Sequence, residues 1–178
     1  IDASGGDFGF SVTINAGISA LKTYDDLLIN FVGDEAGIKN ELNKNSSYLT
    51  FADRIDVTHA SEVINMSDSP SVALRHKKDS SMRVAINLVK NGDADACVSA
   101  GNTGALMSIA RFVLKTIKGV DRPAIMSAVP TLTGPTHVLD LGANIDSRPS
   151  TLLQFAIMGS IAVQNTENIE NPSVGLLN

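Results

Sequence analysis

The run Ala96-Cys97-Val98-Ser99-Ala100-Gly101-Asn102-Thr103-Gly104 passes from small apolar residues into a turn bracketed by glycines. Residues 96 to 99 are typical of a buried β-strand, whereas the sequence after the turn has apolar residues at helical spacing. The predicted helix covers residues 103 to 118 and ends at Gly119. Its inward side chains are Leu106, Ile109, Val113 and Ile117. A strand, a turn and a helix in this order form the repeating unit of a parallel α/β sheet.

Helical segments are also predicted on both sides of this run. One helix places Met82, Ala85, Ile86 and Val89 on one face and ends at Gly92. A helix over residues 150 to 164 is predicted to bury Leu153, Ala156, Ile157, Ser160 and Ile161. Asp34 is expected to cap a weaker helix that ends near Leu42, and residues 43 to 51 are expected to form a loop.

Short β-like runs alternate with these helices. The predicted strands cover residues 27 to 32, 55 to 59, 96 to 99, 124 to 129, 138 to 141 and 174 to 177. The alternation favours an α/β fold built on a mostly parallel sheet. Because no internal repeat or linker interrupts it, residues 1–178 are expected to form a single α/β region. The apolar residues at both ends lead us to expect a portion of a longer chain.

Composition narrows the class of protein. The chain of 178 residues is 43% hydrophobic and 19% charged, which is typical of a globular protein with a buried core. Its formal net charge of −5 disfavours nucleic acid as a partner, because binding to phosphate backbones requires clustered Lys and Arg. No apolar run has the ~20 residues that span a bilayer. With a single cysteine, Cys97, the chain fits a reducing cytoplasm.

Three glycine turns follow predicted strands and could carry chemistry. The first, Asp2-Ala3-Ser4-Gly5-Gly6-Asp7, places two carboxylates and bare backbone at the carboxyl end of a strand, where ligands bind in open α/β sheets. The second, residues 99 to 104, leaves Gly101, Thr103 and Gly104 at a helix N-terminus that could hold phosphate. The third, residues 139 to 146, carries Asp140 and Asn144. We expect the three turns to share one crevice.

Each turn also has a purely structural interpretation. The glycines of the first turn would then only provide positive φ angles, and Asn102 or Thr103 would cap a helix. Asp140 and Asn144 would bond their own backbone, as Asp and Asn commonly do in turns. The spacing lacks G-x-G-x-x-G and the Walker A pattern, so neither a dinucleotide nor a nucleoside triphosphate is implied.

A basic run, Arg75-His76-Lys77-Lys78, precedes Asp79-Ser80-Ser81 at a predicted helix start. It would suit phosphate or an acidic partner, and its alternative is a solvated face. Cys97 is expected to be a buried small residue rather than a nucleophile. The three histidines show no metal-ligand spacing, so no metal is assigned.

Seven segments in order resemble the PlsX-type phosphate acyltransferases, and the resemblance covers nearly the whole chain. The segments are residues 2–7, 75–82, 99–106, 119–124, 139–144, 153–160 and 172–178. The family usually has Met where this chain has Ser4. The resemblance implies a three-layer αβα sandwich with a mostly parallel sheet, similar to isocitrate and isopropylmalate dehydrogenases and phosphotransacetylases, usually as a homodimer. It also implies a family chain roughly twice this length.

The resemblance further implies a reaction: acyl-[acyl carrier protein] and inorganic phosphate give acyl phosphate and free carrier, without a cofactor. The product would feed a membrane glycerol-3-phosphate acyltransferase, so a cytoplasmic protein with peripheral membrane association is expected. Under this interpretation Asn102, Asn144 and Asp140 are the catalytic candidates. The phosphate or substrate would contact Gly5, Gly6, Asp7, Lys78, Ser80, Ser81, Gly101, Thr103, Gly104 and Arg122. The acidic carrier would dock on Arg75, Lys77 and Arg83.

Three other functions remain open at this point. A phosphotransacetylase-like enzyme would use acyl-CoA in place of the carrier. A decarboxylating dehydrogenase on the related fold would need a nicotinamide cofactor and a divalent metal. A non-catalytic domain would bind phosphate or carrier without turnover.

Overall fold

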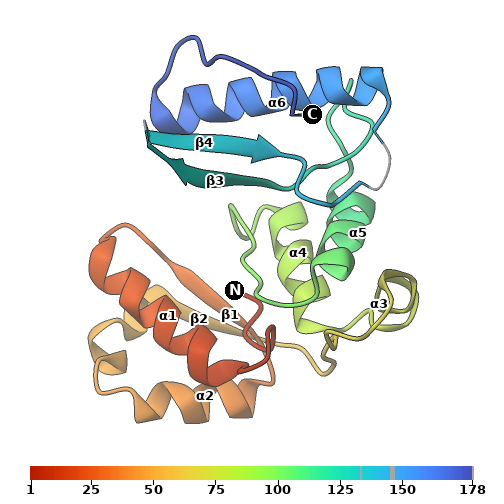
Figure 1. Ribbon diagram of the computed structural model, residues 1–178. Coiled ribbons are helices and arrows are strands. Elements are labelled where there is room, and N and C mark those ends of the chain that lie inside the picture. The colour runs from red at the N-terminus through yellow and green to blue at the C-terminus, as the bar shows by residue number, and fades with distance from the viewer. Residues whose placement is uncertain (133, 145–146, 178) are drawn as a thin grey trace. The chain divides into compact units, whose positions relative to one another are not determined.

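A computed structural model of the chain describes residues 1–132, 134–144 and 147–177 (Figure 1). It divides into two compact units, Ile1–Lys115 and Thr116–Asn178, called unit 1 and unit 2 below. The sequence predicts that residues 1–178 form one α/β region, and this stays a prediction.

Unit 1 contains a small parallel sheet. Strand β1 (Ile29–Gly33) pairs in parallel with β2 (Ile55–His59), with Ile29 opposite Ile55. On the other side of β1, the first three residues of the chain extend the pairing, because the amide of Ala3 donates to the carbonyl of Val32 at 2.9 Å. The amide of Asp2 donates in turn to the carbonyl of Val98 at 2.9 Å. The first residues therefore lie between β1 and the segment around Val98.

Helices lie on both faces of this sheet, because successive side chains of a strand point to opposite sides. Phe31 of β1 is fully buried against α1 (Phe10–Thr23) and α2 (Glu35–Lys44). Its neighbour Val32, also fully buried, packs with Ala60 and with Ala85 of α4 (Ser81–Asn91). Two short 3-10 turns, η1 (Tyr48–Thr50) and η2 (Ala52–Arg54), connect α2 to β2.

Three helices of unit 1 begin with a side-chain cap of the same kind. Ser69 caps α3 (Pro70–His76), Ser80 caps α4 and Asn102 caps α5 (Thr103–Leu114). In each case the side-chain oxygen accepts from an amide in the first turn, which satisfies a donor that the helix itself leaves free. The three helices share a second apolar cluster, formed by Ile64, Ala73, Met82, Ile86, Ala105, Ile109 and Val113.

Unit 2 consists of a β-hairpin and a long helix. Strands β3 (Met126–Thr131) and β4 (Gly134–Leu139) pair antiparallel, which follows from the very short connection between them in the sequence. Helix α6 (Pro149–Glu167) packs on β4.

Several predicted elements are confirmed. The strand over residues 55 to 59 and the helix capped by Asp34 are present, and Gly92 ends α4 in the left-handed conformation with φ 82°. The α/β class is confirmed, because the structure combines helices with strands and contains a small parallel sheet. The three-layer, isocitrate dehydrogenase-like fold stays a prediction.

Other predicted elements are wrong. Residues 96 to 99 and 174 to 177 form no regular strand, although Val98 accepts the hydrogen bond from Asp2. Helix α5 ends at Leu114 rather than at residue 118, because Lys115 adopts a left-handed φ of 68° that no α-helix can continue. In the predicted buried stripe of α6, Leu153, Ile157 and Ile161 are 52 to 63% exposed.

Candidate active site

The first two glycine turns lie against each other in unit 1. A Cβ atom added at Gly5 would lie 3.1 Å from the amide nitrogen of Gly101 and 2.7 Å from a carboxylate oxygen of Asp2. One added at Gly6, where φ is +84°, would lie 3.2 Å from the carbonyl oxygen of Ala100. The two glycines are therefore needed for this close approach of one turn to the other. The first two turns lie side by side, as the prediction of a shared crevice requires.

A buried carboxylate and a partly buried hydroxyl connect these turns, and sequence reasoning missed their contact. Asp2 is 2% exposed, and its Oδ2 accepts a hydrogen bond of 2.6 Å from Ser99 Oγ. Ser99 Oγ in turn accepts from the amide of Gly101 at 3.1 Å. These hydrogen bonds thus link Asp2 of the first turn to Ser99 and Gly101 of the second. The two residues are 97 positions apart, so no local pattern could have revealed their contact.

Helix α5 begins at Thr103, within the second turn, and the amides of its first turn have different partners. Ala105 N donates to Asn102 Oδ1 and Leu106 N donates to Asn102 O. Among the described residues, none accepts a hydrogen bond from the amides of Thr103 or Gly104. Thr103 is exposed, and the positive end of the helix dipole reinforces these two donors. This arrangement can hold an anion such as phosphate.

The side chain of Asn102 is 8% exposed and fully engaged within the protein. Its oxygen caps α5, which confirms the capping interpretation of the turn. Its Nδ2 donates to the carbonyls of Asn65, Met66 and Asp68 at 2.9 to 3.3 Å. Both amide hydrogens are thus used, and a catalytic role for Asn102 stays a prediction.

The residues of the basic segment separate into buried and exposed groups. Lys77 Nζ forms an ion pair of 2.5 Å with Asp68 and donates to the carbonyl of Val63 at 2.6 Å. Ser80 and Ser81, which we expected to contact phosphate, are 0% and 1% exposed, and Ser80 is the α4 cap. Lys78, by contrast, is exposed, as are Arg75 and His76.

The candidate docking residues also differ from one another. Arg75 is exposed in the last turn of α3. Arg83 is half-buried, donates to Asn87 and lies over the ring of Phe112 at 5.5 Å. With Lys77 committed to Asp68, the exposed charges left for a docking surface in this region are those of Arg75 and Lys78.

The third turn belongs to unit 2 and is built around a carboxylate. Asp140 accepts from the amides of Ile125, Ala143 and Asn144 at 2.7 to 3.2 Å and from Asn144 Nδ2 at 3.0 Å. Burial alone would raise the pKa of Asp140, but these hydrogen bonds outweigh it and hold the pKa below its ordinary value. Asn144 Nδ2 also donates to the carbonyl of Pro123. The turn matches the structural interpretation, in which Asp and Asn bond nearby backbone.

The remaining candidate residues differ in exposure. Asp7 and Arg122 are exposed, in unit 1 and unit 2 respectively. Cys97 is half-buried, and burial raises the pKa of its thiol, so it is protonated at neutral pH. Asp146, at the end of the third turn, lies outside the described residues.

The described residues contain neither a metal-binding cluster nor a membrane-spanning helix. Across residues 1–132, 134–144 and 147–177, no three His, Cys, Asp or Glu side chains gather in a way that could hold a metal ion. Over the same part of the chain, no helix combines the length and the apolar character needed to cross a bilayer.

The chain is similar to known proteins along its whole length. It is 66% identical over 178 residues to a phosphate acyltransferase of Ruthia magnifica subsp. Calyptogena magnifica, covering 52% of that protein. The corresponding identities are 58% to the phosphate acyltransferase of Methylococcus capsulatus and 54% to that of Legionella pneumophila, with 52% of each covered. The chain thus spans about half the length of these curated relatives. A model of the family described as "Fatty acid synthesis protein" matches residues 1–178. Since this match includes every residue, the chain belongs to the fatty acid synthesis protein family.

Proposed function

We propose that the protein transfers a fatty acyl group from acyl-[acyl carrier protein] to inorganic phosphate, giving acyl phosphate for phospholipid synthesis. The relatives named phosphate acyltransferase, 54 to 66% identical, support acyl transfer to phosphate. The observation that carries the proposal is the N-terminus of α5, where the amides of Thr103 and Gly104 are free to bind an anion.

The chemistry fits a site that positions its substrates. Phosphate is itself a nucleophile, and a thiol of pKa ~8.5 is a tolerable leaving group. The enzyme therefore needs proximity and stabilisation of the developing oxyanion more than it needs a strong base. Asp140 agrees with this expectation, because a carboxylate with a lowered pKa is a poor base at neutral pH.

We assign the direct contacts to phosphate first to the main-chain amides of residues 101 to 104. Gly5 and Gly6 contribute by letting the first turn approach the second, and Lys78 and Arg122 are exposed cations that could neutralise phosphate. Asp7 lies on the same first turn. The direct roles predicted for Asn144 and Asp140 would require the third turn to join the site, and those for Ser80 and Ser81 would require them to become accessible.

The wider assembly follows the family resemblance. We propose an isocitrate dehydrogenase-like fold, a homodimer, and a cytoplasmic enzyme that delivers acyl phosphate to a membrane glycerol-3-phosphate acyltransferase. The exposed Arg75 and Lys78 are proposed to attract the acidic carrier.

The test uses the complete protein, including any sequence beyond these 178 residues. It is incubated with acyl-[acyl carrier protein] and phosphate, and free carrier thiol and acyl phosphate are followed by mass spectrometry. We expect thiol release that depends on phosphate, and a much lower rate with acyl-CoA. Faster reaction with acyl-CoA would favour the phosphotransacetylase-like alternative, and absence of acyl phosphate from folded protein would contradict the proposal.

A matched pair of variants tests the helix terminus. Thr103→Pro removes one amide hydrogen at the first helical position, where proline fits, and Asn102 already has the extended ψ of 110° that suits a residue before proline. Thr103→Ala removes only the hydroxyl. Loss of one hydrogen bond to a charged ligand should raise the KM for phosphate about tenfold in Thr103→Pro. An equal effect of both variants would assign the contact to the hydroxyl instead.

A further inference from the structure

A tight turn formed by residues 65 to 68 lies beside the start of α5. The amide of Asn65 donates to Asp68 Oδ2 at 2.8 Å, and the amide of Asp68 donates back to the carbonyl of Asn65 at 3.1 Å. Met66 and Ser67, at the tip of the turn, are exposed. The turn therefore has its own hydrogen-bonded frame and presents its tip to solvent.

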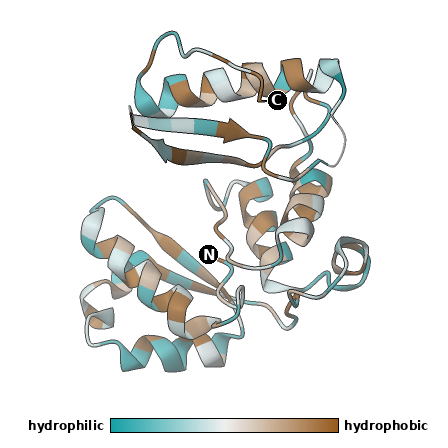
Figure 2. Ribbon diagram, viewed as in Figure 1, coloured by the Kyte–Doolittle hydropathy of each residue, from teal (hydrophilic) through white to brown (hydrophobic). Residues whose placement is uncertain are grey.

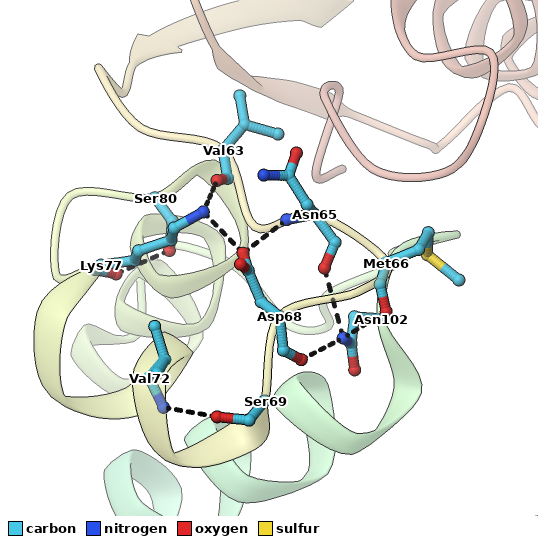
Figure 3. A network of polar contacts seen from close by, with 9 residues as sticks. All are labelled: Val63, Asn65, Met66, Asp68, Ser69, Val72, Lys77, Ser80 and Asn102. Carbon is cyan, nitrogen blue, oxygen red and sulfur yellow. Dashed lines mark hydrogen bonds and ion pairs between the residues drawn. The ribbon is translucent and has the colours of Figure 1, made fainter.

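Asn102 ties this turn to the helix (Figure 3). Its Nδ2 donates to the carbonyls of Asn65, Met66 and Asp68, while its Oδ1 accepts from the amide of Ala105. One side chain thus fixes both the turn and the first turn of α5. Any shift of the turn away from the helix would break hydrogen bonds to a buried amide, which is costly.

Lys77 provides a second, independent tie, from the end of α3 (Figure 3). Its ammonium pairs with Asp68 Oδ2 and donates to the carbonyl of Val63. The hydrogen bond from Lys77, followed by that from the Asn65 amide, holds the pKa of Asp68 below its ordinary value. The carbonyl of Lys77 accepts from Ser80 Oγ at 2.8 Å, which anchors the lysine backbone to the cap of α4.

We propose that Asn102 and Lys77 are positioning residues, which hold the 65–68 turn against the start of α5 so that its tip forms one wall of the phosphate site. This inference rests on the proposed function. It gives Lys77 a role in the site rather than in docking, and it gives Asn102 an effect on the reaction through the turn. A misplacement of about 1 Å in such a wall can cost a large factor in rate.

The test compares three variants of the complete protein. Asn102→Ser keeps an oxygen that can cap α5, lacks the amide group that donates to the three carbonyls, and adds no charge beside the phosphate site. Lys77→Met keeps the length of the side chain and removes its charge. Lys90→Met is the matched control, because Lys90 is an exposed lysine in the last turn of α4.

Two measurements are made on each variant: kcat/KM for phosphate, and hydrogen exchange of the segment from 61 to 70. We expect Asn102→Ser and Lys77→Met each to lower kcat/KM about tenfold and to speed exchange of the turn. The double variant should fall little further than the worse single one, because both ties act on the same turn. Lys77→Arg should recover most of the activity, since guanidinium can also pair with Asp68.

Three results would overturn the inference. The first is an unchanged kcat/KM in Lys77→Met although hydrogen exchange of the turn becomes faster. The second is a loss of kcat/KM in the double variant equal to the product of the two single losses. The third is an effect of Lys90→Met on kcat/KM as large as that of Lys77→Met. If the wild-type protein forms no acyl phosphate, the proposed function fails separately. Hydrogen exchange of the turn with and without phosphate then decides the positioning claim. Slower exchange on adding phosphate in the wild type but not in Lys77→Met supports the claim, and any other pattern contradicts it.

Discussion

The two units bury their apolar residues to very different degrees. In unit 1, β1 is covered on both faces, and Phe31 and Val32 are fully buried. In unit 2, Phe155 and Val163 of α6 are buried, whereas Leu153, Ile157 and Ile161 of the same helix are mostly exposed. Figure 2 shows brown apolar bands on α6 as well as on α4 and α5. All three helices thus carry apolar side chains, but α6 leaves several large ones exposed.

This difference teaches which part of the chain carries its own stability. Unit 1 has closed apolar cores, whereas among the described residues of unit 2 nothing covers the exposed apolar face of α6. Because burial of apolar area is the main favourable term in folding, unit 1 has the larger share of this stabilisation. Apolar surface of this kind is typical of an interface. Four substitutions or conditions can test the contrast.

The largest effect is expected from Phe31→Ala in β1. The ring is fully buried between the sheet and helices α1 and α2, so its loss leaves a cavity and should cost about 3–5 kcal/mol. Urea unfolding followed by circular dichroism measures this change. Leu28→Ala, at a position 73% exposed, is the control and should change stability by less than about 0.5 kcal/mol. Equal effects of the two would show that unit 1 is not closed as described.

Gly17→Ala in α1 should destabilise the protein although alanine is the better helix former. A Cβ at Gly17 would lie 2.6 Å and 2.9 Å from two ring atoms of Phe31. Overpacking of this kind typically costs about 1–3 kcal/mol, which exceeds the gain in helix propensity. Thermal unfolding measures the shift, and a stabilised Gly17→Ala variant would mean that α1 packs more loosely than described.

The same substitution in unit 2 should have the opposite sign. A Cβ at Gly159 of α6 would meet only Leu139 Cδ1, at 4.0 Å, which is an ordinary contact. Gly159→Ala should therefore stabilise α6 by about 0.5–1 kcal/mol through helix propensity alone. Slower hydrogen exchange within residues 149 to 167 is the measurement. A destabilised Gly159→Ala variant would reveal that the face is already covered in the complete protein.

The smallest effect concerns the pH dependence of unit 2. Because hydrogen bonds lower the pKa of Asp140 from its ordinary value of 3.8, the native state binds fewer protons than the unfolded state. Its contribution to stability is complete above pH 3.8 and is lost as the pH falls through the lower native pKa. The difference in unfolding free energy between wild type and Asp140→Asn should thus be largest at neutral pH and should shrink below pH 3.8. A difference independent of pH from 7 to about 3 would contradict this linkage.

Local signals predicted much of the fold. Asp34 before α2 and Gly92 after α4 are strong helix boundaries, and both occur as expected. Helix α1 was not predicted, although Ile14, Ile18 and Leu21 have helical spacing, because it begins without a side-chain cap or an acidic residue in its first turn. The stripe on α6 was predicted correctly as apolar but wrongly as buried. Periodicity shows which face is apolar and does not show what covers it.

The candidate site shows the same limit. The sequence identified the turn at residues 99 to 104, since a glycine turn before a helix has a local pattern. It could not show that Asn102 bonds three carbonyls some 35 positions earlier, or that Lys77 pairs with Asp68. Such contacts depend on tertiary packing. Lys77 illustrates the point, because in the sequence it cannot be distinguished from its exposed neighbour Lys78.

The place of Asp2 between β1 and Val98 has a consequence for biosynthesis. Ribosomes add about 5–20 residues per second, so Val98 is made roughly 5–20 s after Asp2. During this interval the segment at the start of the chain can pair with β1 and has an open edge on its other side. Unpaired edges invite association with other chains. Nascent chains that stall before Val98 emerges should therefore depend more on chaperones than those that stall just after it.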